Sequence, residues 1–156
     1  MPLVIRLKPP HVSAIAGVFF GIGWGLFIDS VAYSNHVHNN VDIVFGFWMP
    51  GIAATLFLLM MMPISSKAIG NTDAFSGGSP MAARLWMLVA FVLGLGSVMA
   101  GMALMITQYT QRTDGKTPKT TWPGFAMFLQ SLFIFIAGIV YRFGGDAVDV
   151  AQYDGF

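Results

Sequence analysis

The stretch GVFFGIGWGLFID, residues 17–29, decides the fold of this chain. It lies inside an apolar run from Val12 to Tyr33 that carries no charge before Asp29. At about 1.5 Å per residue, a helix of this length crosses a hydrocarbon layer of about 30 Å. The run is longer than the apolar part of a signal peptide and ends without a small-x-small cleavage site. We therefore predict a membrane-spanning helix that is retained.

Three glycines give this predicted helix a face without side chains. Gly17, Gly21 and Gly25 fall at i, i+4 and i+8, so another helix can approach this face closely. Asp29 follows on the same face one turn later. Its carboxylate can pair with a partner helix, lie at the membrane interface, or bind a proton or cation. We favour a position at the membrane interface or pairing with another helix, because the cost of a charge in a membrane depends strongly on its depth. We predict that this face packs within the chain or against a partner.

The composition excludes several classes of protein. The chain has 156 residues, of which 56% are hydrophobic and 10% are charged, whereas soluble domains carry roughly 25% charged residues. A formal net charge of +1 gives no electrostatic case for binding nucleic acid. The absence of cysteine from the sequence excludes disulfides, zinc-thiolate sites and cysteine nucleophiles. The sequence therefore predicts an integral membrane protein.

The whole chain divides into apolar segments separated by polar connections. We predict an all-α membrane protein built as a bundle of four transmembrane helices. Pro50 lies inside the second segment and predicts a kink near Phe47. Ser79-Pro80 and Thr121 are typical of helix starts. The predicted boundaries are a lead at 1–11, spans at about 12–33, 43–62, 81–107 and 122–143, and a tail at 144–156.

Small residues also recur at helical spacing in the last two predicted spans. They are Gly94, Ser97 and Gly101 in the third span, and Gly124, Ser131 and Gly138 in the fourth. We predict that both sets serve helix packing or a partner interface. Gln130 is a second polar residue inside a predicted membrane span. We expect it to form an interhelical hydrogen bond rather than a transport site, and such a bond is worth about 0.6 to 2 kcal/mol.

The distribution of basic residues predicts an orientation. Five of the eight Lys and Arg residues fall on the side of the bundle where the chain begins and ends, and three on the other side. The positive-inside rule then favours cytosolic N- and C-termini, with Asp29 toward the lumenal surface.

Three segments carry a family resemblance. They are GVFFGIGWGLFIDS at 17–30, MAARLWMLVAFVLGLGSVMAGM at 81–102 and WPGFAMFLQSLFIFIAGIVYRFGG at 122–145. In this order and spacing, they resemble the transmembrane protein 50 family, which includes the fungal vacuolar protein sorting 68 protein. The lead, PLVIRLKPPH, and the Asn- and His-rich first loop depart from the family pattern, and the chain lacks a cysteine pair seen in animal members.

The resemblance implies a four-span endomembrane protein that is not an enzyme and needs no cofactor. It implies transport from the late endosome to the vacuole or lysosome. The partner that it implies is a vacuolar protein sorting 55 protein, whose animal relatives are the leptin-receptor-overlapping-transcript proteins. Membrane lipid is the other expected partner.

Several alternatives stay open at this point. A transporter or channel subunit would need a polar path near Asp29, Gln130 and Ser131, although spans two and three carry little charge. His36 and His38 are weak evidence for a metal site, and we expect a solvated turn there and no metal. The segment from Tyr153 to Phe156 fits a tyrosine-based sorting signal. The sequence contains no catalytic motif of the metalloprotease, serine hydrolase or phosphate-loop type.

Overall fold

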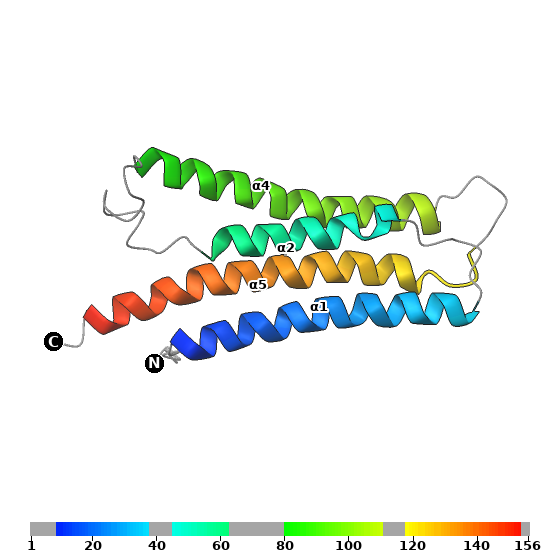
Figure 1. The fold of residues 1–156 in the computed structure, drawn as a ribbon, viewed down its shortest axis with the longest axis horizontal. Coiled ribbons are helices and arrows are strands. Elements are labelled where there is room, and N and C mark those ends of the chain that lie inside the picture. The colour runs from blue at the N-terminus through cyan, green and yellow to red at the C-terminus, as the bar shows by residue number, and fades with distance from the viewer. Residues whose placement is uncertain (1–8, 38–44, 63–79, 111–117, 154–156) are drawn as a thin grey trace, which may run out of the picture.

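The computed structural model describes residues 9–37, 45–62, 80–110 and 118–153, and these residues form a bundle of helices (Figure 1). The elements are α1 (Pro9–Val37), the short 3-10 helix η1 (Phe45–Phe47), α2 (Met49–Met61), α4 (Pro80–Met105), the π-helical turn η2 (Ile106–Thr110) and α5 (Trp122–Tyr153). The described residues contain no strand, and the predicted all-α fold is confirmed.

The helices run alternately up and down the bundle, so α1 begins and α5 ends at the same end (Figure 1). α5 lies between α1 on one side and α2 and α4 on the other, and it contacts all three. The main contact of α1 is with α5, whereas α4 packs against both α2 and α5. α5 is therefore the central helix of the bundle.

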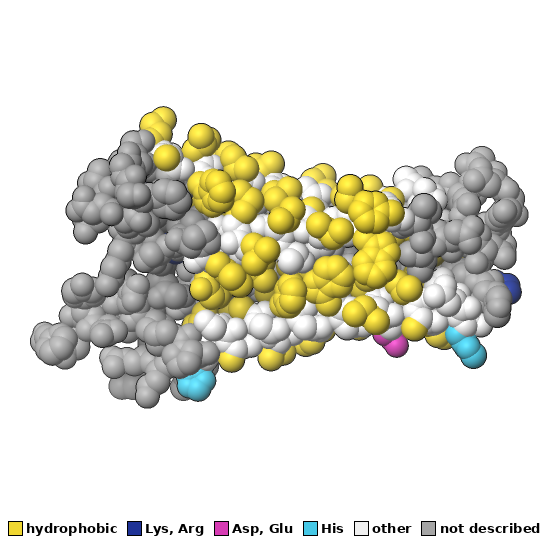
Figure 2. Space-filling model, viewed as in Figure 1, with side chains coloured by type: hydrophobic (Ala, Val, Ile, Leu, Met, Phe, Trp, Pro, Cys, Tyr) yellow, Lys and Arg dark blue, Asp and Glu magenta, His cyan; other side chains and the backbone are white. Residues whose placement is uncertain are grey.

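Three helices are long and apolar enough to cross a membrane. Their spanning parts are His11–Val37, Arg84–Thr110 and Trp122–Gly144, while Phe45–Met61 is apolar but shorter. On the face of the bundle that Figure 2 shows, apolar side chains spread over the region between the two ends. A surface of this kind is suited to acyl chains rather than to water.

The prediction of a kink near Phe47 is wrong. α2 begins at Met49 and places Pro50 in its first turn. A proline there costs little, because the first backbone N–H groups of a helix have no intrahelical partner and the fixed φ suits the helix. Phe45–Phe47 forms a separate 3-10 turn, and the Trp48 N–H donates to the Phe45 carbonyl at 3.0 Å. Pro50 therefore starts the helix instead of bending it.

Two other helix ends differ from the predicted boundaries. α5 continues as a helix to Tyr153 instead of ending near residue 143. At its start, the Trp122 N–H donates to the Thr120 side-chain oxygen at 3.2 Å, so Thr120 provides the side-chain cap that we expected from Thr121. The Thr121 carbonyl accepts the first helical bond, from the Phe125 N–H at 3.2 Å.

The core consists of three clusters of buried side chains. One contains Phe27, Phe47, Tyr109 and Met127; the next contains Ala16, Ala54, Leu58, Ile134 and Ala137; the third contains Phe57, Met61, Ala90 and Phe135. Each cluster includes a residue of α5, which follows from its central position.

Candidate functional site

α1 presents Gly23 to α5 and contacts it closely there. A Cβ atom at Gly23 would lie 3.1 Å from the Gln130 carbonyl oxygen and 3.2 Å from Ile134 Cγ1. Two helices can approach this closely only where side chains are missing. The same face of α1 buries Val12, Ala16, Phe27, Ser30 and Ser34.

Gly17, Gly21 and Gly25 lie on the opposite face of α1 and are exposed. A Cβ atom added to any of the three would have no other atom within 4 Å. The geometry explains this, because two residues of a helix are about 200° apart, which puts Gly21 and Gly25 across the helix from Gly23. Of the two alternatives predicted for this face, packing within the chain does not occur among the described residues. A partner interface on this face stays a prediction.

Asp29 lies on this exposed face, and its side chain is exposed as well. α1 continues past Tyr33 to Val37, so Asp29 lies about 12 Å from the end of the helix rather than about 6 Å. We define the exposed glycine face as Gly17, Gly21, Gly25 and Asp29. It combines a surface without side chains with a carboxylate at its end.

The small residues of α4 face the interior. Gly94, Ser97 and Gly101 are buried. A Cβ at Gly94 would lie 2.8 Å from ring atoms of both Phe57 and Phe135. A Cβ at Gly101 would lie 3.3 Å from the side-chain oxygen of Ser131. These three residues let α4 approach α2 and α5.

The small residues of α5 also serve contacts within the chain. Gly124 lies against the ring of Tyr109, and Gly138 lies against the ring of Phe57. Ser131 is buried, and its hydroxyl donates to the Met127 carbonyl at 3.3 Å. Larger side chains at 124 or 138 would displace an aromatic ring.

Gln130 lies in the centre of the bundle, where its amide group contacts Gly51 in the first turn of α2. Among the described residues, neither Oε1 nor Nε2 of Gln130 has a hydrogen-bond partner. The interhelical hydrogen bond that we expected from Gln130 is therefore absent from the described part of the chain. Gln130 and the exposed Asp29 do not share a polar path, because one is fully buried and the other lies on the outer face of α1.

The interhelical side-chain hydrogen bond between α1 and α2 comes from residues that our sequence reasoning missed. The Trp24 indole N–H donates to the Thr55 hydroxyl oxygen at 3.3 Å, and that hydroxyl donates to the Gly51 carbonyl at 2.8 Å. A tryptophan in the middle of a span was the available signal, because a buried indole N–H needs an acceptor.

The predicted histidine pair and the possible sorting signal lie partly outside the described residues. His36 is exposed at the end of α1, and His38 lies outside the described residues. No group of three metal-binding side chains occurs in the part of the chain that the structure describes. Tyr153 is the last residue of α5, and Phe156 lies outside the described residues.

Comparisons with known proteins agree with this architecture. The sequence pattern of the Uncharacterised protein family (UPF0220) matches residues 8–150. A relative from Dictyostelium discoideum, described as Transmembrane protein 50 homolog, is 28% identical over 151 residues, which cover 94% of this chain and 96% of the relative. No solved structure matches significantly.

Proposed function

Since this chain belongs to the Uncharacterised protein family (UPF0220), we propose that it is a non-enzymatic subunit of a small complex in endosomal or other endomembranes. Its role in this proposal is transport from the late endosome to the vacuole or lysosome. The chain is an integral membrane protein, as its three spanning helices and its relative described as a transmembrane protein indicate.

The exposed glycine face is the observation that carries the proposal. Helices associate in lipid mainly through close van der Waals contact, which residues without side chains permit. Gly17, Gly21 and Gly25 have no neighbour within 4 Å of an added Cβ, so a second helix would meet no obstacle. A carboxylate in a membrane span prefers protein or water to lipid. A partner helix with a basic or hydrogen-bonding side chain opposite Asp29 would provide that environment.

The partner and the pathway are supported by sequence resemblance. The segments 17–30, 81–102 and 122–145 resemble the transmembrane protein 50 family, which includes the fungal vacuolar protein sorting 68 protein. We therefore propose a membrane protein of the vacuolar protein sorting 55 or leptin-receptor-overlapping-transcript type as the partner on α1. The alternative of a transporter or channel subunit gains no support from Asp29 and Gln130, which lie apart.

The test is co-purification of this partner in mild detergent with variants of the exposed glycine face. Gly21→Leu and Gly25→Leu should each reduce the recovered partner at least about tenfold, because a leucine there prevents close approach. Gly96→Leu is the matched control: Gly96 is also an exposed helical glycine with open space around it, but it lies on α4. It should leave recovery unchanged.

Sorting of a vacuolar cargo in cells provides the second measurement. The two α1 variants should missort the cargo, whereas the α4 control should not. Normal co-purification and sorting in the double variant Gly21→Leu/Gly25→Leu would remove the basis of the proposal. Ion flux in reconstituted vesicles that Asp29→Asn abolishes, with the fold intact, would favour the transporter instead.

A further inference from the structure

A groove opens between the first half of α4 and the end of the spanning part of α5. Its volume is about 490 Å³, within the range of about 300 to 1,000 Å³ that small-molecule sites occupy. The buried side chains of Phe57 and Met61 from α2 form its floor. Phe91 and Val92 of α4 and Ile139 of α5 line its walls. This lining offers a hydrocarbon chain apolar contacts on several sides.

Two arginines are the basic residues of the groove. Arg84 is exposed near the start of α4, and Arg142 is half-buried near the end of the spanning part of α5. Because α4 and α5 are antiparallel, both lie at the same membrane interface (Figure 1). No carboxylate is among the described residues that line the groove. Arg142 has another interaction, but a guanidinium has five N–H donors and can hold a second acceptor too.

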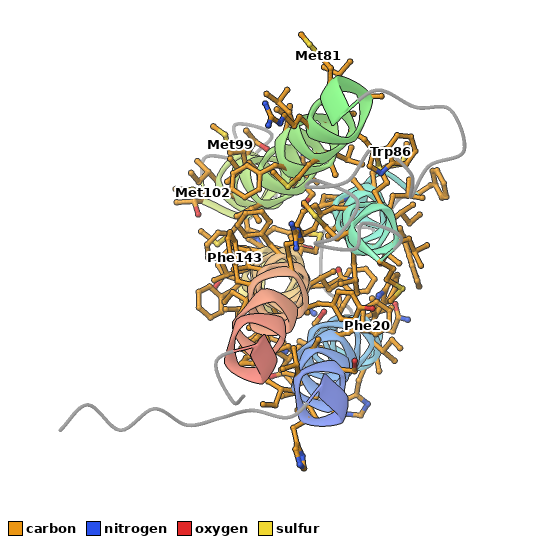
Figure 3. All side chains as sticks on the ribbon, turned by 90° about the vertical axis from the view of Figure 1, so that its left-hand side faces the viewer. Phe20, Met81, Trp86, Met99, Met102 and Phe143 are labelled. Carbon is orange, nitrogen blue, oxygen red and sulfur yellow. The ribbon has the colours of Figure 1, made fainter. Side chains whose placement is uncertain are left out.

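The groove opens on the lateral surface of the bundle. Phe143, one of its lining residues, is 65% exposed. Viewed along the bundle, Phe143 lies on the same side as Met99 and Met102, while Trp86 lies on the other side (Figure 3). An acyl chain can therefore enter sideways from the bilayer while the headgroup stays at the interface.

We propose that this groove binds one anionic phospholipid, whose phosphate contacts Arg84 and Arg142 and whose acyl chain lies along Phe91 and Val92. Arginine matches the geometry of phosphate oxygens with paired N–H donors. Basic pockets between spanning helices are suited to anionic headgroups. Two positive charges, with no carboxylate among the described lining residues, favour an anionic lipid over a neutral one. The exposed aromatic side chain of Phe143 can cover the acyl chain at the rim of the groove.

Native mass spectrometry of the delipidated full chain in detergent can measure this preference. Dioleoyl phosphatidylserine should bind about tenfold more tightly than dioleoyl phosphatidylcholine. The double variant Arg84→Gln/Arg142→Gln should bind both lipids equally. Lys119→Gln should keep the preference, because it removes an exposed positive charge beside the Val37 carbonyl at the end of α1, far from the groove. Circular dichroism should show that all variants keep their helical content.

A second pair of variants tests the apolar part of the site. Val92→Trp narrows the groove without changing charge and should weaken phosphatidylserine binding about tenfold. Leu95→Trp lies on the same exposed side of α4 but outside the lining, so it should bind as the unmodified chain does. Glycerophosphoserine is the same headgroup without acyl chains. It should not compete with phosphatidylserine for the groove.

Three results would overturn the proposal. Equal affinity of the unmodified chain for the two lipids would mean ordinary contact with bulk lipid. Competition by glycerophosphoserine would mean an anion site without a role for the acyl chain. A folded double arginine variant that still prefers phosphatidylserine would place the anionic site elsewhere on the chain.

Discussion

The ring of Phe57 from α2 lies directly on Gly138 of α5, with no room for a Cβ atom between them. Phe57 is fully buried, and its ring also faces the Phe135 ring with a centroid separation of 5.2 Å. Gly94 of α4 borders the same two rings. The three helices therefore meet at one aromatic pair because two of them carry glycine there.

Gly138→Ala should destabilise the bundle by about 1 to 3 kcal/mol, since the added methyl group displaces a buried ring. Thermal unfolding in detergent, followed by circular dichroism, measures the change. Gly96→Ala on α4 is the control, because a Cβ there meets nothing within 4 Å. It should be neutral or slightly stabilising, as alanine favours helix more than glycine does. Equal effects of the two substitutions would contradict the packing at Gly138.

Gln130→Met should leave the free energy of unfolding unchanged or raise it by about 1 kcal/mol. Methionine has a similar length and removes an amide that has no hydrogen-bond partner among the described residues. Gln130→Ala should instead destabilise by about 2 kcal/mol or more, because it leaves a cavity. Urea or detergent unfolding compares the three proteins. A clear loss of stability in Gln130→Met would show that the amide binds a group in the folded protein.

Thr55→Val should cost about 0.6 to 1.7 kcal/mol, because the Trp24 indole then loses its acceptor on α2. Thr107→Val is a close control. The Thr107 hydroxyl donates to the Ala103 carbonyl four residues back at 2.8 Å, just as the Thr55 hydroxyl donates to the Gly51 carbonyl. Thr107 is exposed, however, and the bond from the Trp24 indole goes to Thr55. Thr107→Val should change stability by less than about 0.5 kcal/mol. Similar losses in both variants would mean that the bond to Trp24 contributes little.

Single cysteines should locate the two ends of the bundle on opposite sides of the membrane. The chain has no cysteine of its own, so each introduced thiol is the sole reactive one. His11 lies near the start of α1 and Lys119 donates to the Val37 carbonyl at its end, so both substitutions are at exposed positions near opposite ends of the bundle. In sealed vesicles with the cytosolic face outward, an impermeant maleimide should label His11→Cys, and it should label Lys119→Cys only after permeabilisation. The reverse pattern would contradict the orientation predicted from the basic residues.

The sequence was sufficient to predict the helices but not the packing face of α1. α1 is apolar on all sides, so hydrophobic periodicity could not distinguish a face toward α5 from a face toward lipid. Two glycine-bearing faces were available, one with Gly17, Gly21 and Gly25 and the other with Gly23. The longer series favours packing on Gly17, Gly21 and Gly25, yet α5 packs on Gly23. Which face of α1 packs on α5 depends on how bulky side chains such as Phe27 fit against their neighbours in three dimensions. The spacing of residues in the sequence does not give this information.

The packing faces of α4 and α5 were easier to locate. Gly94 and Gly101 are seven residues apart, as are Gly124, Ser131 and Gly138, and this spacing matches the seam of two packed helices. The start of α2 was harder, because an interior proline can either kink a helix or begin one. The groove with Arg84 and Arg142 could not be predicted, since residues 58 positions apart meet only after the helices have packed.

The brevity of α2 has a consequence for the thickness of the surrounding bilayer. Phe45–Met61 extends over about 26 Å, if its α-helical part rises 1.5 Å and its 3-10 part about 2 Å per residue. Hydrocarbon layers range from about 27 Å in the endoplasmic reticulum to about 32 Å in sterol-rich plasma membranes. On the flank that α2 forms, a thin membrane needs almost no compression to match the protein, whereas a thick one has to be indented by several ångströms. Hydrophobic mismatch along the described part of this flank is therefore smaller in a thin membrane than in a thick one.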